Sequence, residues 1–255
     1  MSRLGIIPAR YASSRFPGKP LVDLEGRTML ERVWRAARAS DLDRVLIATD
    51  DVRIADEARR IGADVTMTAA DLPSGSDRCA AAVRSAGLRP SIVVNIQGDE
   101  PLLQPQLLNG LVRALEQSGA DVATPISRIL FSAELDDAAV VKVVRGANNH
   151  ALYFSRAAVP AIRDVNRSDW TQHHTYWKHI GLYAYTWPSL QRHVQLPPSA
   201  LEQCEKLEQL RLLEDGARFV CVETEQMLMS VDTPDDAERV RLWLRAHGTE
   251  APFPA

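Results

Sequence analysis

The sequence predicts an α/β fold with a mixed, mainly parallel sheet and an inserted antiparallel β region. In the first half, short apolar runs alternate with segments of helical hydrophobic spacing, which is typical of a parallel sheet covered by helices. Between about residues 126 and 190, runs of strand composition follow one another with no long helix between them, which indicates an antiparallel excursion. With 255 residues, the chain is long enough for a single domain carrying such an insertion.

Apolar and β-branched runs define the expected strands. The first contains Ile6 and Ile7 and ends at Pro8, where a loop begins. The other expected strands are residues 44–49, 64–67, 91–96, 122–125, 140–144, 151–155, 179–185 and 219–223.

Capping residues and helical spacing define the expected helices. Thr28 with Glu31, and Ser199 with Glu202, have the spacing of a capping box. Thr233 is an N-cap candidate and is followed by a proline at the first helical position. The expected helices are residues 29–40, 51–61, 77–86, 104–118, 200–213 and 234–247.

Composition excludes several classes of protein. The net charge of -3 and the pI of about 6.1 argue against a general nucleic-acid binder, which needs a cationic face. We expect no membrane association and a cytoplasmic location, because the sequence has neither an apolar run of membrane-spanning length nor a signal-peptide pattern. Cys79, Cys204 and Cys221 lack metal-ligand spacing and are expected to be reduced.

A cationic loop follows the first strand. It contains Arg10, Arg15 and Lys19, with Gly18 beside the lysine. In an open parallel sheet, ligands bind beyond the carboxyl ends of the strands, so these side chains suit a polyphosphate. A solvated basic connection is the alternative, because the spacing matches neither the P-loop nor the dinucleotide fingerprint.

Acidic residues mark two further positions. Asp99 and Glu100 follow the strand at residues 91–96 and suit a divalent cation, although Asp and Gly after a strand also form tight turns. Asp232 lies just before the last helix, where its side chain is free to face a ligand.

Seven motifs in order resemble the 3-deoxy-manno-octulosonate cytidylyltransferases, also called CMP-Kdo synthetases. They are IPARYASSRFPGKPL, SGSDR, NIQGDEP, ALYFSRAAVP with a later RD, HIGLYAY, EKLEQLR and VDTP, and they span nearly the whole chain. The resemblance implies the Rossmann-like nucleotide-diphospho-sugar transferase fold. It also implies CTP as a substrate, magnesium as a cofactor and a homodimer formed through the inserted β region.

The resemblance also assigns the nucleotide site. It implies that the CTP phosphates are held by Arg10, Ser13, Arg15 and Lys19, and that the nucleotide is lined by Ser74, Gly75, Gln97 and Gly98. Asp99 and Asp232 would hold magnesium, and these two acids with Lys19 form the expected catalytic set.

For the sugar-acid acceptor, the resemblance implies contacts from Arg156, Arg163, His179, Tyr183, Glu208 and Gln209. The two arginines would meet the carboxylate and the others the hydroxyl groups. Without the resemblance, His179 and Tyr183 also suit a buried strand face, and Glu208 suits a solvated helix surface.

The expected reaction is a single in-line displacement. The anomeric hydroxyl of the acceptor attacks the α-phosphorus of CTP, which forms the CMP-sugar and releases pyrophosphate. The sequence departs from the family pattern at Ala161-Ile162, at residues 137–139 and at residues 225–230. An amino-Kdo, another sialic-acid-like sugar or a phosphonate therefore stay open as acceptors, and a nonenzymatic sensor is the remaining alternative.

Overall fold

The computed structural model describes residues 2–13 and 15–248. The chain folds into two compact units. Unit 1 comprises Met1–Gly110 with Gln226–Ala255, and unit 2 comprises Leu111–Glu225. The chain passes from unit 1 into unit 2 within the helix α4 (Pro105–Ser118).

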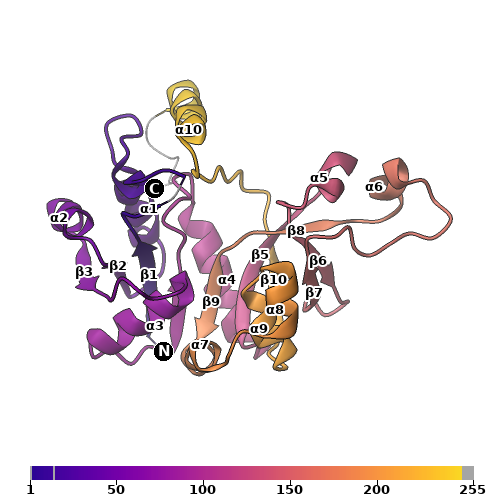
Figure 1. Cartoon of the computed structure of the whole chain (residues 1–255), viewed down its shortest axis with the longest axis horizontal. Helices are drawn as coiled ribbons and strands as arrows, with labels where there is room; N and C mark the ends of the chain where they lie inside the picture. The colour runs from indigo at the N-terminus through magenta and orange to yellow at the C-terminus, as the bar shows by residue number, and fades with distance from the viewer. Residues whose placement is uncertain (1, 14, 249–255) are drawn as a thin grey trace. The chain divides into compact units, whose positions relative to one another are not determined.

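Unit 1 is built on a parallel sheet with the strand order β3-β2-β1-β4. Figure 1 shows β3, β2 and β1 side by side in this order. The strands are β1 (Arg3–Ala9), β2 (Arg44–Thr49), β3 (Asp64–Met67) and β4 (Ile92–Asn95). Ile6 and Ile7 of β1 are both fully buried, as expected for adjacent residues of a strand covered on both faces. Because β1 and β4 are parallel neighbours, the loops after them leave the same edge of the sheet.

Three helices connect these strands: α1 (Met29–Arg38), α2 (Val52–Arg60) and α3 (Gly75–Ser85). Their N-caps are Thr28, Asp51 and Ser74, and each side chain accepts a hydrogen bond from a first-turn amide. The predicted start of the third helix, at residue 77, is wrong. Ser74 caps this helix two residues earlier, and Gly75 takes its first helical position.

The predicted capping box at Thr28 forms its first half, since Thr28 accepts from the Glu31 amide at 3.1 Å. The Glu31 carboxylate is used elsewhere. It pairs with Arg35 at 2.9 Å and with Arg60 of α2 at 2.8 Å, so it ties α1 to α2.

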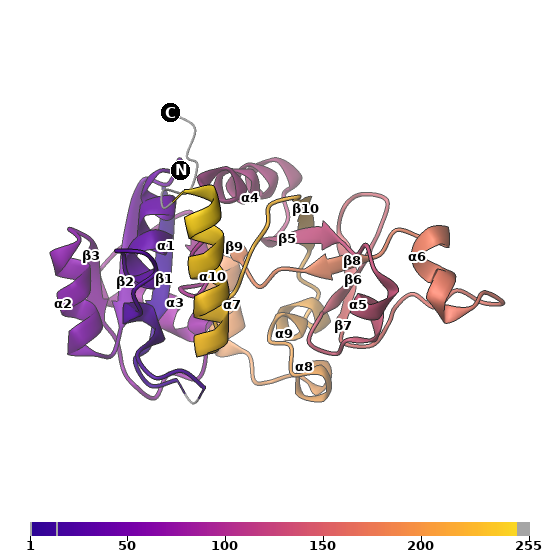
Figure 2. The ribbon, with the colours of Figure 1, turned by 90° about the horizontal axis from the view of Figure 1, so that it is seen from above.

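The C-terminal helix α10 (Pro234–His247) completes unit 1. It begins with the predicted Thr233 cap, and Asp236 returns the hydrogen bond to form a capping box. Val240 and Leu244 pack with Met29 of α1 in one apolar cluster, and Figure 2 shows α10, in yellow, beside α1. This packing fixes the segment that carries Asp232.

Unit 2 contains a mixed sheet arranged around β5 (Val122–Arg128). The strand β10 (Phe219–Glu223) is parallel to β5, whereas β8 (Trp177–His179) and β9 (Tyr183–Thr186) are antiparallel to it. Next to β8 lies β6 (Lys142–Arg145), which pairs with β7 (Ala151–Ser155). The predicted antiparallel region is thus confirmed.

The prediction of one strand over residues 179–185 is wrong. The chain forms two short strands because β9 pairs with β5 at Val122 and Ala123, whereas β8 pairs with it from Ile126 onward. Between them, the Ile180 amide bonds the Pro125 carbonyl at 3.0 Å. His179 and Tyr183 therefore do not alternate along one continuous strand.

The helices of unit 2 are α5 (Ser132–Asp136), η2 (Arg167–Asp169), α6 (Trp170–His173), α7 (Trp187–Gln195), α8 (Ala200–Glu205) and α9 (Gln209–Glu214). The capping box of Ser199 and Glu202 is confirmed. The predicted single helix over residues 200–213 is wrong, because Lys206 adopts a left-handed conformation with φ of 54° and ends α8.

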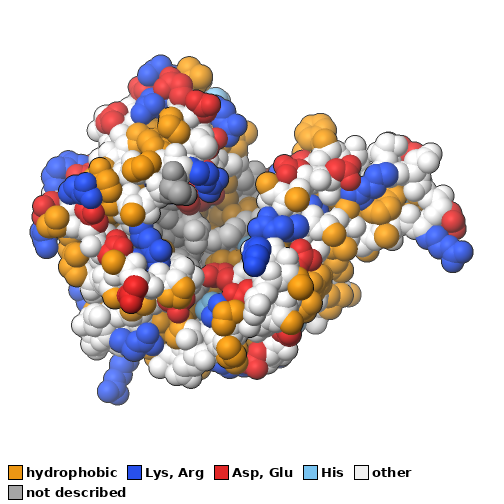
Figure 3. All heavy atoms as spheres, viewed as in Figure 1, with side chains coloured by type: hydrophobic (Ala, Val, Ile, Leu, Met, Phe, Trp, Pro, Cys, Tyr) orange, Lys and Arg blue, Asp and Glu red, His pale blue; other side chains and the backbone are white. Residues whose placement is uncertain are grey.

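Over the described ranges 2–13 and 15–248, no helix combines the length and the apolar character needed to cross a bilayer. On the face seen in Figure 3, basic and acidic side chains are interspersed, and the whole chain has a net charge of -3.

Candidate active site

The cationic loop of unit 1 runs from the end of β1 to the short helix η1 (Lys19–Leu21). Gly18 closes it, since its amide donates to the Tyr11 carbonyl at 2.8 Å and its φ is +74°. A Cβ at this position would lie 3.1 Å from the Tyr11 ring. Glycine therefore meets both the backbone and the packing requirement immediately before Lys19.

Lys19 forms the centre of a charged cluster. Its Nζ donates to Asp99 Oδ2 at 2.7 Å, to Asp232 Oδ1 at 3.1 Å and to the Val231 carbonyl at 3.2 Å. Burial opposes the charge on the ammonium, but the charges and hydrogen bonds of the two carboxylates outweigh this effect and raise the Lys19 pKa. The lysine is therefore held as a cation between the two acids.

The two acids come from distant parts of the chain, and a backbone hydrogen bond between their segments holds both beside Lys19. The Val231 amide donates to the Asp99 carbonyl at 2.9 Å, which places Asp232 beside the loop after β4. Arg15, whose side chain is 64% exposed, pairs with Asp232 Oδ2 at 3.0 Å. The structure thus brings together Arg15 and the whole predicted catalytic set.

Glu100, which the sequence marks with Asp99 as suited to a divalent cation, belongs to the same cluster, although the resemblance assigns magnesium to Asp99 and Asp232 alone. Burial, together with the neighbouring charges of Asp99 and Asp232, raises its pKa to about 8. Within the described part of the chain, its Oε2 is buried without a hydrogen-bond partner. Its place after Asp99 in the strand-end motif was the available signal.

The other predicted nucleotide residues lie in loops of unit 1. Arg10 donates from Nη2 to the Leu72 carbonyl, and Ser13 Oγ accepts from the Phe16 amide at 3.4 Å. Ser74 is used as a helix cap and also donates to Asp77 Oδ2 at 2.7 Å.

Gly75 is the first residue of α3, and Gln97 and Gly98 follow the end of β4. A Cβ at Gly98 would approach the Pro8 carbonyl oxygen to 3.2 Å, so the chain after β4 can pass close to β1 only with a small residue here. At Gly75 a Cβ would make ordinary contacts, the nearest at 3.5 Å from Pro8. Gln97 is half-buried.

Arg78 is a further residue that the sequence prediction missed. It is completely buried on α3, and it contacts Thr68 and pairs with Asp50 at 3.2 Å. Burial is the main cause of its lowered pKa, and the charge of Arg10 adds to the effect. Its place in the SGSDR motif was the signal, and its contacts join α3 to the residues that directly follow β2 and β3.

His179 lies at the end of β8 in unit 2. Its Nε2 is 2.9 Å from Thr124 Oγ1, and its ring lies edge-on to Phe154 with a centroid distance of 5.1 Å. Burial lowers the His179 pKa to about 3, so the imidazole is neutral at physiological pH. Burial likewise raises the Tyr183 pKa well above its ordinary value.

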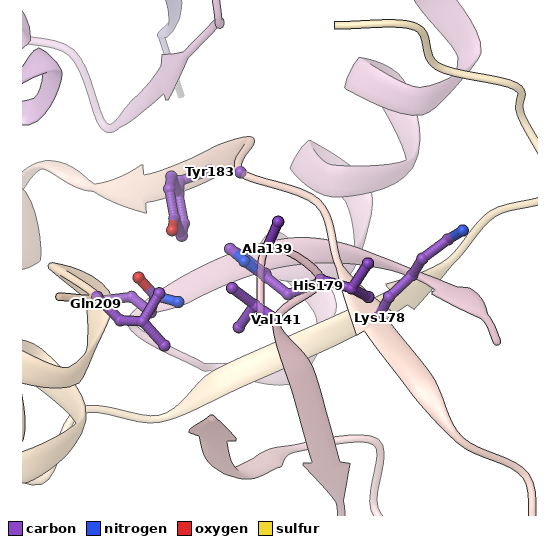
Figure 4. A pocket seen from close by; sticks show the side chains of 9 residues that line it. Ala139, Val141, Lys178, His179, Tyr183 and Gln209 are labelled. Carbon is purple, nitrogen blue, oxygen red and sulfur yellow. The ribbon is translucent and has the colours of Figure 1, made fainter. Parts of the chain in front are cut away.

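A cavity of about 410 Å³ opens beside these residues. Figure 4 shows the Tyr183 hydroxyl, the His179 ring and the Gln209 amide directed into one space, whereas Lys178 points away. Lys178 is ion-paired with Glu134. Gln209 is 3% exposed, and its Nε2 has no hydrogen-bond partner within the described ranges. The remaining lining residues are Ala139, Val140, Val141, Gly181 and Leu207.

The other predicted acceptor residues are not part of this lining. Glu208 is the residue before α9, not a residue in the middle of a helix. Arg163 is 93% exposed and lies 3.4 Å from Asp164. The Arg156 guanidinium donates to main-chain carbonyls, at 2.7 Å to Glu205 and at 2.8 Å to Ala138.

Comparisons with known proteins agree with the motifs. A family model described as "Cytidylyltransferase" matches residues 4–223. A 3-deoxy-manno-octulosonate cytidylyltransferase of Nitratidesulfovibrio vulgaris is 49% identical over 94% of this chain and 95% of that protein. The protein of the same name from Parabacteroides distasonis is 42% identical over 96% of this chain and 98% of that protein.

A solved structure gives the same result. It is described as CMP:2-keto-3-deoxy-manno-octonic acid synthetase complexed with CTP, and it matches with a TM-score of 0.89 and 36% identity over 96% of this chain and 99% of that chain. The match confirms the predicted nucleotidyltransferase fold, and the relatives confirm the resemblance. The chain belongs to the 3-deoxy-manno-octulosonate cytidylyltransferase family.

Proposed function

We propose that the protein transfers CMP from CTP to the anomeric hydroxyl of a 2-keto sugar acid, with 3-deoxy-D-manno-octulosonate as the first candidate. The observation that carries the proposal is the cluster of Lys19, Asp99 and Asp232 at the strand ends of a chain of this family. In the reaction, the hydroxyl oxygen forms a bond to the α-phosphorus, the bond from that phosphorus to the β-phosphate oxygen breaks, and pyrophosphate and one proton are released.

The cations of the loop after β1 would bind the triphosphate of CTP. Lys19 and Arg15 already contact carboxylate oxygens, and phosphate oxygens are equivalent anionic partners for both side chains. Such preorganised cations stabilise the charge that develops on the leaving pyrophosphate. Arg10 would add a third cation from the beginning of the same loop.

The acids of the cluster fit magnesium. Asp99 and Asp232 converge on one cation, the Lys19 ammonium, and present the hard oxygen ligands that magnesium prefers. Over residues 2–13 and 15–248, no group of three or more His, Cys, Asp or Glu is arranged to hold a metal. One or two carboxylates are sufficient, because magnesium keeps waters and substrate phosphates as its other ligands. When bound, the metal would neutralise charge on the triphosphate.

The cavity in unit 2 would hold the hydroxyl groups of the acceptor. His179, Tyr183 and Gln209 are neutral, and each offers hydrogen-bonding atoms to a sugar. The buried Nε2 of Gln209 is the strongest support, since a buried donor without a partner is unusual unless a ligand supplies the acceptor. The 410 Å³ volume lies within the range of small-molecule sites.

The assembly and the compartment are part of the proposal. We propose a homodimer formed through the inserted region at about residues 126–190, supported by the large apolar side chains Leu130, Phe131 and Leu152, which are 63%, 70% and 62% exposed. Sedimentation velocity would measure the mass in solution. A cytoplasmic location agrees with the free thiols of Cys79, Cys204 and Cys221.

Pyrophosphate release tests the function directly. CTP and magnesium are incubated with 3-deoxy-D-manno-octulosonate, an amino-Kdo, a sialic acid and a small phosphonate in parallel. Release with 3-deoxy-D-manno-octulosonate alone is the expected result. Release with another acceptor only would show that the acceptor is wrongly assigned, whereas the proposed cytidylyltransferase activity would stand. Binding of CTP with no release for any acceptor would favour the sensor alternative.

A further inference from the structure

Arg156 makes an unusual set of contacts in unit 2. It follows β7, and its guanidinium donates to three main-chain carbonyls: Glu205 at 2.7 Å, Ala138 at 2.8 Å and Lys206 at 3.4 Å. A guanidinium presents its donors as a rigid planar fork, so these bonds fix the relative positions of the segments that carry the carbonyls.

The carbonyls belong to two segments that border the acceptor cavity. One segment, residues 137–141, which we name the wall loop, contains the lining residues Ala139, Val140 and Val141. The other, residues 205–207, which we name the wall turn, contains the lining residue Leu207 and leads into Gln209. Arg156 is thus bonded to both walls at once.

Lys142 holds the wall loop a second time. It is completely buried, and its Nζ donates to the Asp137 carbonyl at 2.9 Å and to the Val140 carbonyl at 2.6 Å. A buried ammonium requires such acceptors, because it has lost its hydration. The wall loop therefore receives bonds from Lys142 and Arg156 although it has no regular secondary structure.

The wall turn is held in place by hydrogen bonds to the carboxylate of Glu205. The Glu205 carboxylate accepts from Ser155 Oγ at 2.6 Å and from the Arg156 amide at 2.9 Å. The next residue, Lys206, has the left-handed backbone that ends α8. The turn is thus fastened to the end of β7 through both the side chain and the backbone of Glu205.

We infer that Arg156 is a positioning residue, which sets the shape of the acceptor cavity by joining the wall loop to the wall turn, and that Lys142 does the same for the wall loop alone. The inference rests on the proposed function, because it assigns the cavity to the acceptor. It differs from the role expected for Arg156 from the resemblance, which was a direct contact with the acceptor carboxylate.

Hydrogen exchange of the free enzyme separates the two roles, because it needs no acceptor. In Arg156→Lys, which keeps the charge and loses the fork, amides of residues 137–141 and 205–210 should exchange about tenfold faster than in wild type. In Lys142→Met, which keeps most of the side-chain length, only residues 137–141 should do so. Unchanged exchange in the Arg156→Lys protein would overturn the inference.

Arg192→Lys is the matched control. Arg192 also lies in unit 2 and donates to a main-chain carbonyl, that of Asp215, at 2.6 Å. Its replacement should leave exchange in the wall loop and the wall turn as in wild type. Faster exchange throughout unit 2 in the Arg156→Lys protein would mean general destabilisation, and that result would also contradict a role confined to the cavity walls.

Steady-state kinetics gives the second measurement. Arg156→Lys should raise the KM for the sugar acid by about tenfold, while the KM for CTP stays within about twofold of wild type. A higher acceptor KM with unchanged exchange would assign Arg156 to direct contact with the acceptor. If wild type turned over no sugar acid, the proposed function would fail, whereas the exchange result would still report whether Arg156 holds the walls.

Discussion

The two units present opposite solutions to binding a polar ligand. In unit 1, the cluster is built from ion pairs: Lys19 pairs with Asp99 and Asp232, and Arg15 also pairs with Asp232 in the free protein. In unit 2, the groups directed into the cavity are neutral: the His179 pKa is lowered to about 3, the Tyr183 pKa is raised, and Gln209 carries no charge. The first arrangement suits a triphosphate with a metal, and the second suits hydroxyl groups.

The difference follows from the cost of burying each kind of group. A buried charge needs a partner at all times, so Lys19, whose side chain is only 17% exposed, must be paired before the nucleotide binds. Leaving a buried neutral amide without a partner costs much less free energy than leaving a buried charge unpaired. The Gln209 amide can therefore be unpaired until a ligand binds. We therefore expect substitutions in the charged cluster of unit 1 to lower the rate of the reaction. Substitutions in the cavity of unit 2 should mainly raise the KM for the acceptor.

The largest effect is expected from Asp99→Asn. The substitution removes one carboxylate charge from the cluster at constant shape, and the loss of such an electrostatic contact should lower kcat/KM by about 10³-fold. Steady-state assays of pyrophosphate release measure it. Asp64→Asn is the control, since Asp64 forms an exposed pair with Arg44, with side chains 54% and 47% exposed. Equal activity in the two variants would contradict the assignment of Asp99.

The second effect concerns the pH dependence of stability. The His179 pKa is about 3 in the folded protein, against an ordinary value of 6.5, so below pH 6.5 the unfolded chain binds a proton that the folded chain does not. Stability should therefore fall as the pH drops from 7.5 to 5, by about 2 kcal/mol from this residue. Urea unfolding of His179→Gln at both pH values should lack that contribution.

His247→Gln is the control for this measurement. His247 lies exposed at the end of α10, where its Nδ1 is 2.9 Å from the Trp243 carbonyl oxygen. Its variant should keep the pH dependence of wild type. The same dependence in the His179→Gln protein would mean that His179 is not held neutral, and the contrast between a charged site and a neutral cavity would be lost.

Much of the fold of unit 1, and part of its charged cluster, could be predicted from the sequence. Thr28, Asp51 and Thr233 are caps whose side chains act locally, so the helices that follow them were predicted at or within one residue of their starts. The loops after β1 and β4 leave the same edge of a parallel sheet, so Lys19 and Asp99 could be expected to meet, although they are 80 residues apart.

The remainder depends on contacts that no local pattern contains. Lys206 takes a left-handed backbone that usually favours Gly or Asn, and its position is fixed by the bonds of Glu205 and Arg156. Residues 179–185 divide into two strands because one edge of β5 is shared between them. The resemblance assigns Arg156 to the acceptor carboxylate, whereas its bonds to three main-chain carbonyls depend on segments that are distant in the sequence.

A smaller effect is expected from Gln209→Leu, which should stabilise the free protein and weaken binding of the acceptor. The substitution removes a buried donor that has no partner in the described part of the chain, so the free protein should gain about 1 kcal/mol in the free energy of unfolding. The acceptor KM should rise by about tenfold, because a sugar hydroxyl loses its partner. Chemical denaturation and steady-state kinetics on the same preparation measure both. Loss of stability would indicate that the Gln209 amide is already satisfied.

The smallest effect on stability is expected from Arg15→Gln. Arg15 is 64% exposed, and its pair with Asp232 lies at the protein surface, where an ion pair contributes no more than about 0.5 kcal/mol. Unfolding of the free protein should therefore be almost unchanged. The KM for CTP should nevertheless rise by several-fold, because the guanidinium would bind phosphate oxygens in the complex. The increase should shrink as the salt concentration rises, because an exposed charge is screened. A CTP KM equal to that of wild type at low salt would remove Arg15 from the nucleotide site, and Lys19 would remain as its central cation.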